Sequence, residues 1–199
     1  MICLKISVKR LLKLRWSVAY DKIVEMTIAN KNDLNKANQS FDLIGRLDIR
    51  FENGKWEYSE VLADAVLRKQ YPNYDGANAE DYISSMDRVA FLAYDGANCV
   101  GQILIAMTWN NYAHIEDISI AESHRHQGIG TKLLAKAEEW AKVARLKGLS
   151  LECQDNNILA SRFYKKNGFV LGGVNTELYA MLGEPYASET AVFWYKKLG

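Results

Sequence analysis

The segment HRHQGIGTKLL, residues 124–134, places basic residues and two glycines directly before an apolar-periodic stretch. A loop at the start of a helix binds anions, because its backbone N–H groups have no helical partner and the helix dipole adds partial positive charge. Gly128 and Gly130 let a ligand approach this backbone closely. The segment therefore predicts a phosphate-binding loop.

The spacing of this loop excludes the two commonest nucleotide-binding loops. A dinucleotide fingerprint needs glycine or alanine three residues after its second glycine, where this chain has Leu133. A Walker loop needs Gly-Lys followed by Ser or Thr, whereas Thr131 precedes Lys132 here. What the chain has instead is Arg125-x-x-Gly-x-Gly after an alternating segment.

That alternating segment, HIEDISI, predicts a strand that carries two neighbouring acids, Glu116 and Asp117. On a regular strand, neighbours point to opposite faces, so the two carboxylates are expected to point away from each other. A carboxylate can accept a proton from an alkylammonium group, whose pKa of about 10.4 keeps it from attacking at neutral pH. A structural ion pair is the alternative for either acid. The expected faces are His114, Glu116, Ile118 and Ile120 against Ile115, Asp117 and Ser119.

The elements that must hold these residues follow from hydrophobic period and turn signals. The expected elements are a hairpin over 41–61 around Asn53-Gly54, a helix over 61–71, a loop or short helix over 72–87, two strands over 88–109 around Asp95-Gly96, a strand over 112–123, a helix over 128–147 stopped by Gly148, a strand over 149–154, a helix over 156–167, and strands over 169–174 and 189–198. Strand, helix, strand in the second half implies a parallel pair. The predicted class is α/β, more closely an α+β mixed sheet.

Composition predicts one soluble domain: 199 residues, 49% hydrophobic and 25% charged. The cysteines Cys3, Cys99 and Cys153 are widely separated and odd in number, which indicates neither a disulfide framework nor a CxxC metal site. We therefore expect a reduced, cytoplasmic protein without a metal. Cys153 is either a buried packing residue or a nucleophile.

Residues 1–25 form a basic segment with a net charge of +4, given by Lys5, Lys9, Arg10, Lys13, Arg15 and Lys22 against Asp21 and Glu25. Its charges interrupt every apolar run, so it predicts neither a membrane span nor a secretion signal. It is either an amphipathic surface helix or an extension upstream of a true start at Met26. The expected domain is 26–199, with a net charge of −3 that disfavours nucleic acid and favours a small cationic substrate.

Two motifs together resemble those of the GCN5-related N-acetyltransferase (GNAT) superfamily. The first is the Arg-x-x-Gly-x-Gly loop, and the second is NILASRFYKKNGF, residues 157–169, which matches the pattern Asn-x-x-Ala-x-x-Phe-Tyr-x-x-x-Gly-Phe. The resemblance implies a central mixed, splayed sheet flanked by helices, with acetyl-CoA as co-substrate. The stretches FDLIGRL, WNNYAHIEDISI, LECQDNNILASRFY, LYA and AVFWY further resemble streptothricin acetyltransferases.

This narrower resemblance implies acetylation of the β-lysine amine of streptothricin, a cationic antibiotic, and hence resistance. Alternatives are a protein-lysine or polyamine N-acetyltransferase and a non-catalytic acetyl-CoA-binding regulator. The implied partner is a small cationic amine, and a homodimer is left open. Acids and aromatics suit such an acceptor, and the candidates are Glu80, Asp81, Asp87, Trp109 and Tyr112.

The superfamily resemblance also implies site roles. Glu116 is the expected general base, with Asp117 beside it, and Tyr164 is the expected acid that protonates the departing thiolate. Asn157, Ala160 and Tyr164 share one helical stripe at i, i+3 and i+7. The expected acetyl-CoA-binding residues are Ile118, Ser119, Ile120, Arg125, His126, Gln127, Gly128, Ile129, Gly130, Thr131, Asn157, Ala160 and Tyr164.

Overall fold

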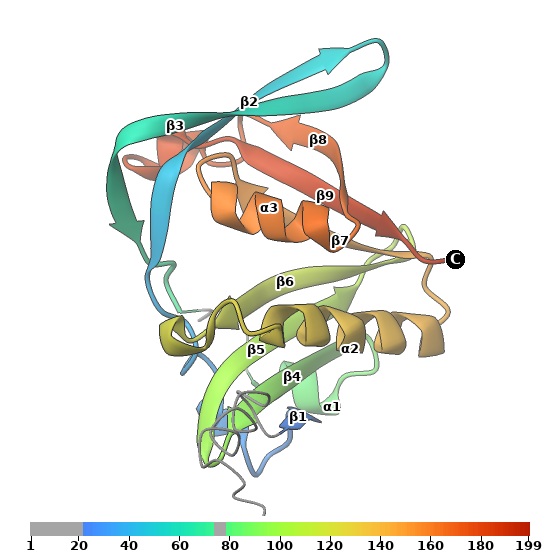
Figure 1. Ribbon diagram of the computed structural model, residues 1–199. Helices are drawn as coiled ribbons and strands as arrows, with labels where there is room; N and C mark the ends of the chain where they lie inside the picture. Colours follow the sequence, from blue (N-terminus) through green and yellow to red (C-terminus); the bar gives the residue numbers. More distant parts are fainter. Residues whose placement is uncertain (1–21, 74–78) are drawn as a thin grey trace, which may run out of the picture.

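The fold is built on a seven-stranded mixed sheet in a computed structural model that describes residues 22–73 and 79–199 (Figure 1). In spatial order the strands are β1 (Lys22–Glu25), β4 (Arg88–Asp95), β5 (Asn98–Met107), β6 (Tyr112–Ile120), β7 (Gly148–Gln154), β9 (Ala191–Lys197) and β8 (Val170–Asn175). Neighbours are antiparallel except β6 and β7, which are parallel. The mixed sheet and its parallel pair confirm the predicted class.

The N-terminal strand β1 lies within the segment that the sequence analysis assigned to a basic extension. Its four residues pair with β4, from Lys22 opposite Tyr94 to Glu25 opposite Phe91. The rest of that segment, 1–21, lies outside the described residues, and so does Cys3.

Helices cover both faces of the sheet. The apolar stripe of α2 (Ile129–Val143), which includes Leu133 and Ala137, packs into the larger core against the middle strands, as its 3.6-residue period predicts. Helix α3 (Ile158–Lys166) adds to the same core. The single turn α1 (Asp81–Ser84) covers a smaller core on the opposite face. No helix in the described ranges is long and apolar enough to cross a membrane.

A long hairpin, β2 (Phe41–Glu52) and β3 (Lys55–Lys69), forms a separate two-stranded sheet. Its turn is the predicted one, because Asn53 and Gly54 both have positive φ, 51° and 75°. The predicted helix over 61–71 is wrong, since β3 continues to Lys69. An irregular bulge sets residues 63–66 of β3 opposite a single residue of β2, and it interrupts the alternation that would have predicted a strand.

The predicted end of the long helix is also wrong. Helix α2 ends at Val143, and Arg145 then takes a left-handed conformation with φ of 59°. Gly148 is the first residue of β7 rather than a helix stop, and its role is packing: a Cβ there would lie 2.6 Å from the Lys196 carbonyl oxygen and from the Tyr112 ring.

The parallel strands β6 and β7 pair along only part of their length. The register joins residues 112–115 to 148–151, and beyond Ile115 the strands diverge (Figure 1). The splayed sheet that the sequence analysis expected is thus present. We call the space between the diverging ends the wedge. Strand β6 lacks a β7 partner along the wedge, which leaves that edge free to pair with a ligand.

Candidate active site

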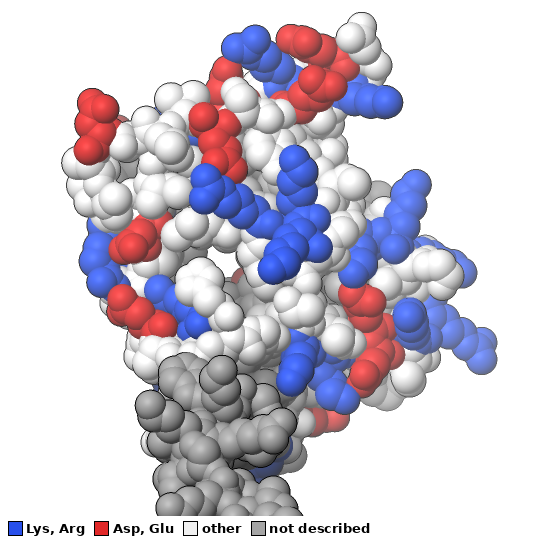
Figure 2. Space-filling model, in the orientation of Figure 1, with Lys and Arg blue, Asp and Glu red and all other residues white. Residues whose placement is uncertain are grey.

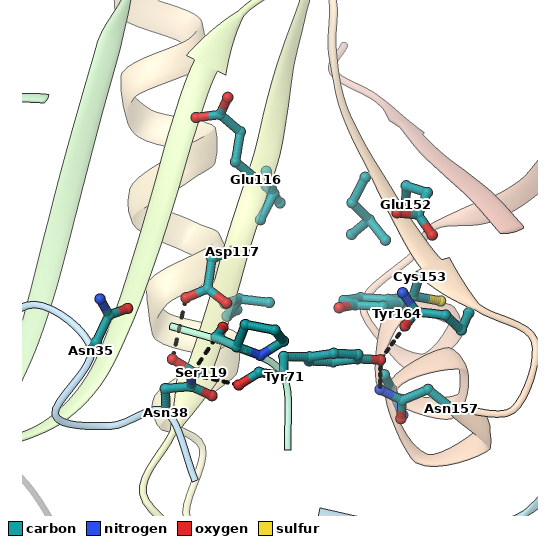
Figure 3. Close-up of a pocket in the computed structure, with 16 residues that line it drawn as sticks. Asn35, Asn38, Tyr71, Glu116, Asp117, Ser119, Glu152, Cys153, Asn157 and Tyr164 are labelled. Atoms are coloured by element: carbon teal, nitrogen blue, oxygen red, sulfur yellow. Dashed lines mark hydrogen bonds between the residues drawn. The ribbon is translucent and has the colours of Figure 1, made fainter. Parts of the chain in front are cut away.

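A cavity of about 270 Å³ opens in the wedge. Its walls come from the diverging halves of β6 and β7, from the start of α3 and from the segments that flank the β2–β3 hairpin (Figure 3). The lining residues are Asn35, Asn38, Tyr71, Pro72, Ile115, Glu116, Asp117, Ile118, Ser119, Leu151, Glu152, Cys153, Gln154, Asn157, Ala160 and Tyr164. Three of these residues are acids, and none of the described lining residues is Lys, Arg or His.

The two acids on β6 do not point to opposite faces, so that prediction is wrong. A bulge leaves Glu116 without a register partner, because Leu104 pairs with Asp117 and Ile105 with Ile115. The extra residue shifts the alternation by one position. Ile115 and Ile118 therefore both pack toward the larger core, while Glu116 and Asp117 both face the other side and line the cavity.

Glu116 is held by two side chains of neighbouring elements. The Tyr82 hydroxyl of α1 donates a hydrogen bond to Oε2, and the Arg88 guanidinium of β4 lies 3.5 Å from the same oxygen. Arg88 also lies over the Tyr82 ring, 5.6 Å from its centroid. These contacts fix the carboxylate at the edge of the cavity.

The partners of Asp117 among the described residues are neutral. Its Oδ2 accepts hydrogen bonds from Gln102 Nε2 at 2.7 Å and from Ser119 Oγ at 3.2 Å. No ion pair involving Asp117 is found within residues 22–73 and 79–199. Burial raises the pKa of Asp117, because desolvation of the carboxylate outweighs the two hydrogen bonds. A raised pKa makes this carboxylate a stronger base than an exposed one.

Tyr164 lies across the cavity from Asp117 (Figure 3). Its side chain is buried among aromatic rings, including Phe169 at 5.9 Å and Trp194 at 6.4 Å between centroids. Burial raises the pKa of the Tyr164 phenol well above its usual value, so the hydroxyl keeps its proton at neutral pH. Such a phenol can donate a proton but does not act as a base.

The other two residues of the predicted α3 stripe also reach the cavity. Asn157 is the N-cap of α3, since its Oδ1 accepts a hydrogen bond of 3.1 Å from the Ala160 N–H. Its Nδ2 donates to the Tyr71 hydroxyl at 3.3 Å, so both ends of the amide have partners within the protein. The Ala160 methyl group leaves space beside the wedge.

The glycine loop takes the geometry that the sequence analysis expected. Gly128 has φ of 83° as the residue before α2, a conformation that L side chains rarely adopt. The first helical hydrogen bond runs from Lys132 N–H to the Gly128 carbonyl oxygen, so the preceding N–H groups are not used by the helix. Gly130 serves contact with α3: a Cβ there would lie 3.0 Å from Phe163 Cζ.

Side chains of the loop have roles that differ from simple anion contacts. Arg125 donates from Nε to the Ile120 carbonyl oxygen at 3.1 Å and from an Nη to that of Gln39 at 3.3 Å. It therefore ties the loop to the end of β6. His126, Gln127 and Thr131 are exposed. Figure 2 shows Lys and Arg side chains gathered over α3, beside a hollow in the surface; α3 carries Arg162, Lys165 and Lys166.

Several cavity residues escaped the sequence analysis. Glu152 lies within β7, whose sequence is otherwise mostly apolar, and Tyr71 lies in the segment that the sequence analysis predicted as a helix, so neither residue belonged to a motif. Asn35 and Asn38 precede the hairpin and carried no motif. Only tertiary contacts bring these segments to the wedge. None of the proposed acceptor residues Glu80, Asp81, Asp87, Trp109 and Tyr112 lines the cavity.

Cys153 lines the cavity but is not suited to nucleophilic attack. The thiol is buried, and burial raises its pKa to about 12. The thiolate is the nucleophilic form and is scarce at neutral pH under these conditions. Cys153 is a packing residue.

Comparison with known proteins agrees with the fold and the site. Residues 55–169 match the Acetyltransferase (GNAT) family, and this match covers more than half of the chain. The chain belongs to the GNAT family, and it is an acetyl-CoA-dependent N-acetyltransferase. Streptothricin acetyltransferase A of Bacillus subtilis (strain 168) is 45% identical over 175 residues, which cover 88% of this chain and 99% of that protein.

Two solved structures have the same fold. One, from Bacillus anthracis str. Ames, is provisionally named a streptothricin acetyltransferase and was solved in complex with acetyl coenzyme A. It has a TM-score of 0.81 and 31% identity, and the match covers 89% of this chain and 98% of that one. The second, a nourseothricin acetyltransferase, has a TM-score of 0.76 and 24% identity, and the match covers 92% of this chain and 100% of that one.

Proposed function

We propose that this protein transfers the acetyl group of acetyl-CoA to a primary amine of streptothricin, most specifically the amine of its β-lysine moiety, and so inactivates the antibiotic. The observation that carries the proposal is 45% identity to a streptothricin acetyltransferase along nearly its whole length. The cavity supports it, because three acidic side chains and no described Lys, Arg or His line it. A polycationic acceptor matches that charge.

The chain has residues that fit acetyl-CoA as the acetyl donor, which supplies an activated thioester. The N–H groups of 128–131 at the start of α2 suit the pyrophosphate, by the same physics that favours anions at any helix start. The unpaired edge of β6 over Ile118, Ser119 and Ile120 offers N–H and C=O groups to the amide arm. The exposed Lys165 and Lys166 of α3 add positive charge nearby.

Glu116 and Asp117 supply the base function in this proposal. Glu116 attracts the ammonium group of the acceptor, and the Arg88 and Tyr82 contacts keep its carboxylate in place. Burial raises the pKa of Asp117, which favours uptake of the released proton by this carboxylate. Transfer proceeds directly or through a water molecule that bridges the amine and the carboxylate.

Tyr164 supplies the acid function. As the acceptor nitrogen forms its bond to the acetyl carbon, the carbon–sulfur bond breaks, and the Tyr164 hydroxyl donates its proton to the departing sulfur. In becoming an amide, the ammonium nitrogen loses two protons. One replaces the proton that Tyr164 gives to the sulfur, and the other passes through the carboxylates to solvent, so the products are an amide, a free thiol and one proton. The reaction is a direct transfer in a ternary complex, because Cys153 is not suited to carry the acetyl group.

Release of free thiol tests the substrate assignment. Turnover is measured with acetyl-CoA and streptothricin, spermidine or a lysine peptide as parallel acceptors. We expect streptothricin to give the highest kcat/KM. If streptothricin releases no more thiol than buffer while another amine does, the acceptor assignment is wrong.

A further inference from the structure

A chain of hydrogen bonds runs along the β7 side of the cavity and ends on Glu152. Asn157 Nδ2 donates to the Tyr71 hydroxyl at 3.3 Å, and the Tyr71 hydroxyl donates to Gln154 Oε1. Gln154 Nε2 donates to the Tyr179 hydroxyl at 2.9 Å, and the Tyr179 hydroxyl donates to Glu152 Oε1. In this way Tyr71 and Tyr179, far apart in the sequence, are both joined to the segment 152–157.

Every donor in the chain points the same way, from the start of α3 toward the carboxylate. Hydrogen bonds in series polarise one another, so such a chain strengthens the final bond to the anion. The Asn157 amide that begins it is fixed by its cap on α3. The chain therefore holds Glu152 in one position and favours its charged form.

Within the described residues, Glu152 nevertheless has no ion-pair partner. The charge of Lys69 lowers the pKa of Glu152, but the Lys69 ammonium group is paired with Glu189. Burial raises the pKa of Glu152 despite the Tyr179 hydrogen bond. The carboxylate lies on the β7 wall, opposite the acids of β6 (Figure 3).

From these contacts we infer that Glu152, positioned by Tyr179, binds a second ammonium group of the acceptor while the reacting amine lies at the β6 wall. The enzyme thereby selects amines that carry two positive charges. This inference rests on the proposed function for the position of the acceptor. It adds a second subsite, at Glu152, whose ligand is the alkylammonium group of the acceptor that is not acetylated.

Direct binding tests the subsite without relying on turnover. Dissociation constants are measured by calorimetry for α,ω-diamines of three to six carbons and for the monoamine of the same length. Wild-type protein is expected to bind the best diamine about tenfold more tightly, the size of one charge-assisted contact. Glu152→Gln, which can still accept from Tyr179, is expected to remove that preference.

The matched control is Glu139→Gln, on the exposed face of α2, which should keep the diamine preference. If no diamine binds more tightly than its monoamine, or if Glu152→Gln keeps the preference, the subsite does not exist. Should streptothricin prove not to be a substrate, the diamine preference would still stand, so the two proposals fail separately.

Kinetics separate this binding role from a role in proton transfer. With the acceptor that gives the highest turnover, Glu152→Gln should raise the acceptor KM about tenfold, with kcat within about twofold and the KM for acetyl-CoA unchanged. A large fall in kcat with an unchanged acceptor KM would make Glu152 the base and overturn the inference.

Tyr179→Phe tests the positioning role while leaving the carboxylate intact. It removes the last donor of the chain, and we expect a smaller rise in acceptor KM, about threefold, in the same direction as Glu152→Gln. Tyr195→Phe is the control, since Tyr195 packs on Tyr112 away from the cavity. Equal effects of the two Tyr→Phe changes would contradict the positioning role and show a general effect on the fold.

Discussion

Glu116 and Asp117 are neighbours that occupy one side of β6, yet their environments differ. Glu116 has a cationic partner, Arg88, whereas the partners of Asp117 among the described residues are the Gln102 amide and the Ser119 hydroxyl. In the proposed mechanism this difference divides the work between a carboxylate that attracts the amine, Glu116, and one whose raised pKa favours accepting a proton, Asp117. Opposite them, the buried phenol of Tyr164 keeps its proton at neutral pH, and the proposed mechanism transfers this proton to the leaving group.

Substitution of these residues tests the proton-transfer roles. Tyr164→Phe and Glu116→Gln should each lower kcat by about 10² to 10⁴, the usual contribution of a positioned acid or base. The kcat of Asp117→Asn should fall by a factor in the same range, because Asp117 receives the proton in the proposed mechanism. The measurement is thiol release at saturating substrates, and Cys153→Ala should stay within about threefold of wild type. Near-wild-type kcat in Tyr164→Phe and Glu116→Gln would remove both residues from the mechanism.

Asp117→Asn should also stabilise the protein at neutral pH. Burial raises the pKa of Asp117 above its unfolded value, so between the two values the native state holds a proton that the unfolded chain has lost. Stability therefore falls as pH rises through this window. The gain in Tm of Asp117→Asn over wild type should reach its maximum above the native pKa of Asp117. It should vanish as the pH falls toward the unfolded pKa of about 3.9.

Thermal melting between pH 3.5 and pH 8 checks this prediction, with Asp64→Asn on the exposed bulge of β3 as the control. A Tm gain that is the same at every pH would show that charge burial is not its cause. Loss of turnover together with a gain in stability would mark Asp117 as a residue kept for function at a cost to the fold.

At the scale of elements, the start of α2 and the middle of α3 form one unit. Gly130 lies against the Phe163 ring, which brings the N–H groups of the glycine loop beside the stripe that begins at Asn157. The two family motifs, about 30 residues apart in the sequence, are thus in direct contact. Their contact sets the distance between the expected phosphate site and the wedge.

Gly130→Ala should therefore weaken donor binding. Its Cβ would lie 3.0 Å from Phe163 Cζ, so the ring between α2 and α3 must shift, and overpacking of this kind costs about 1–3 kcal/mol. We expect the KM for acetyl-CoA to rise several-fold with little change in acceptor KM. Adding Phe163→Leu, which removes the ring, should restore the KM. Failure of this rescue would mean that Gly130 serves the ligand directly and not the helix contact.

On the scale of the whole molecule, the wedge divides the sheet into two halves that pair through only a few residues of β6 and β7. The hairpin adds a second connection, because Arg162 of α3 forms an ion pair with Glu60 of β3. A ligand in the wedge would contact both halves at once. The homodimer and the cytoplasmic location stay predictions, and sedimentation in solution tests the first.

Coenzyme A should consequently stabilise the whole fold. A ligand that binds only the native state at 100 times its Kd adds about 2.7 kcal/mol, which for a chain of this length corresponds to roughly 5–10 °C in Tm. Differential scanning fluorimetry with and without coenzyme A measures the shift. Gly130→Ala should show a smaller shift at the same concentration. No shift in wild type at millimolar coenzyme A would contradict donor binding in the wedge.

The sequence by itself determined most of the local elements and the glycine loop. Asn53-Gly54 specified its turn, the apolar period specified α2, and the two motifs indicated the family, because each depends on residues close together in the chain. Tertiary structure decided what faces the cavity. The bulge at Glu116 puts Glu116 and Asp117 on the same face of β6. The bulge at 63–66 interrupts the alternation in β3 that would have predicted a strand. Glu152, Tyr71 and Tyr179 meet through long-range packing, which short-range spacing does not encode.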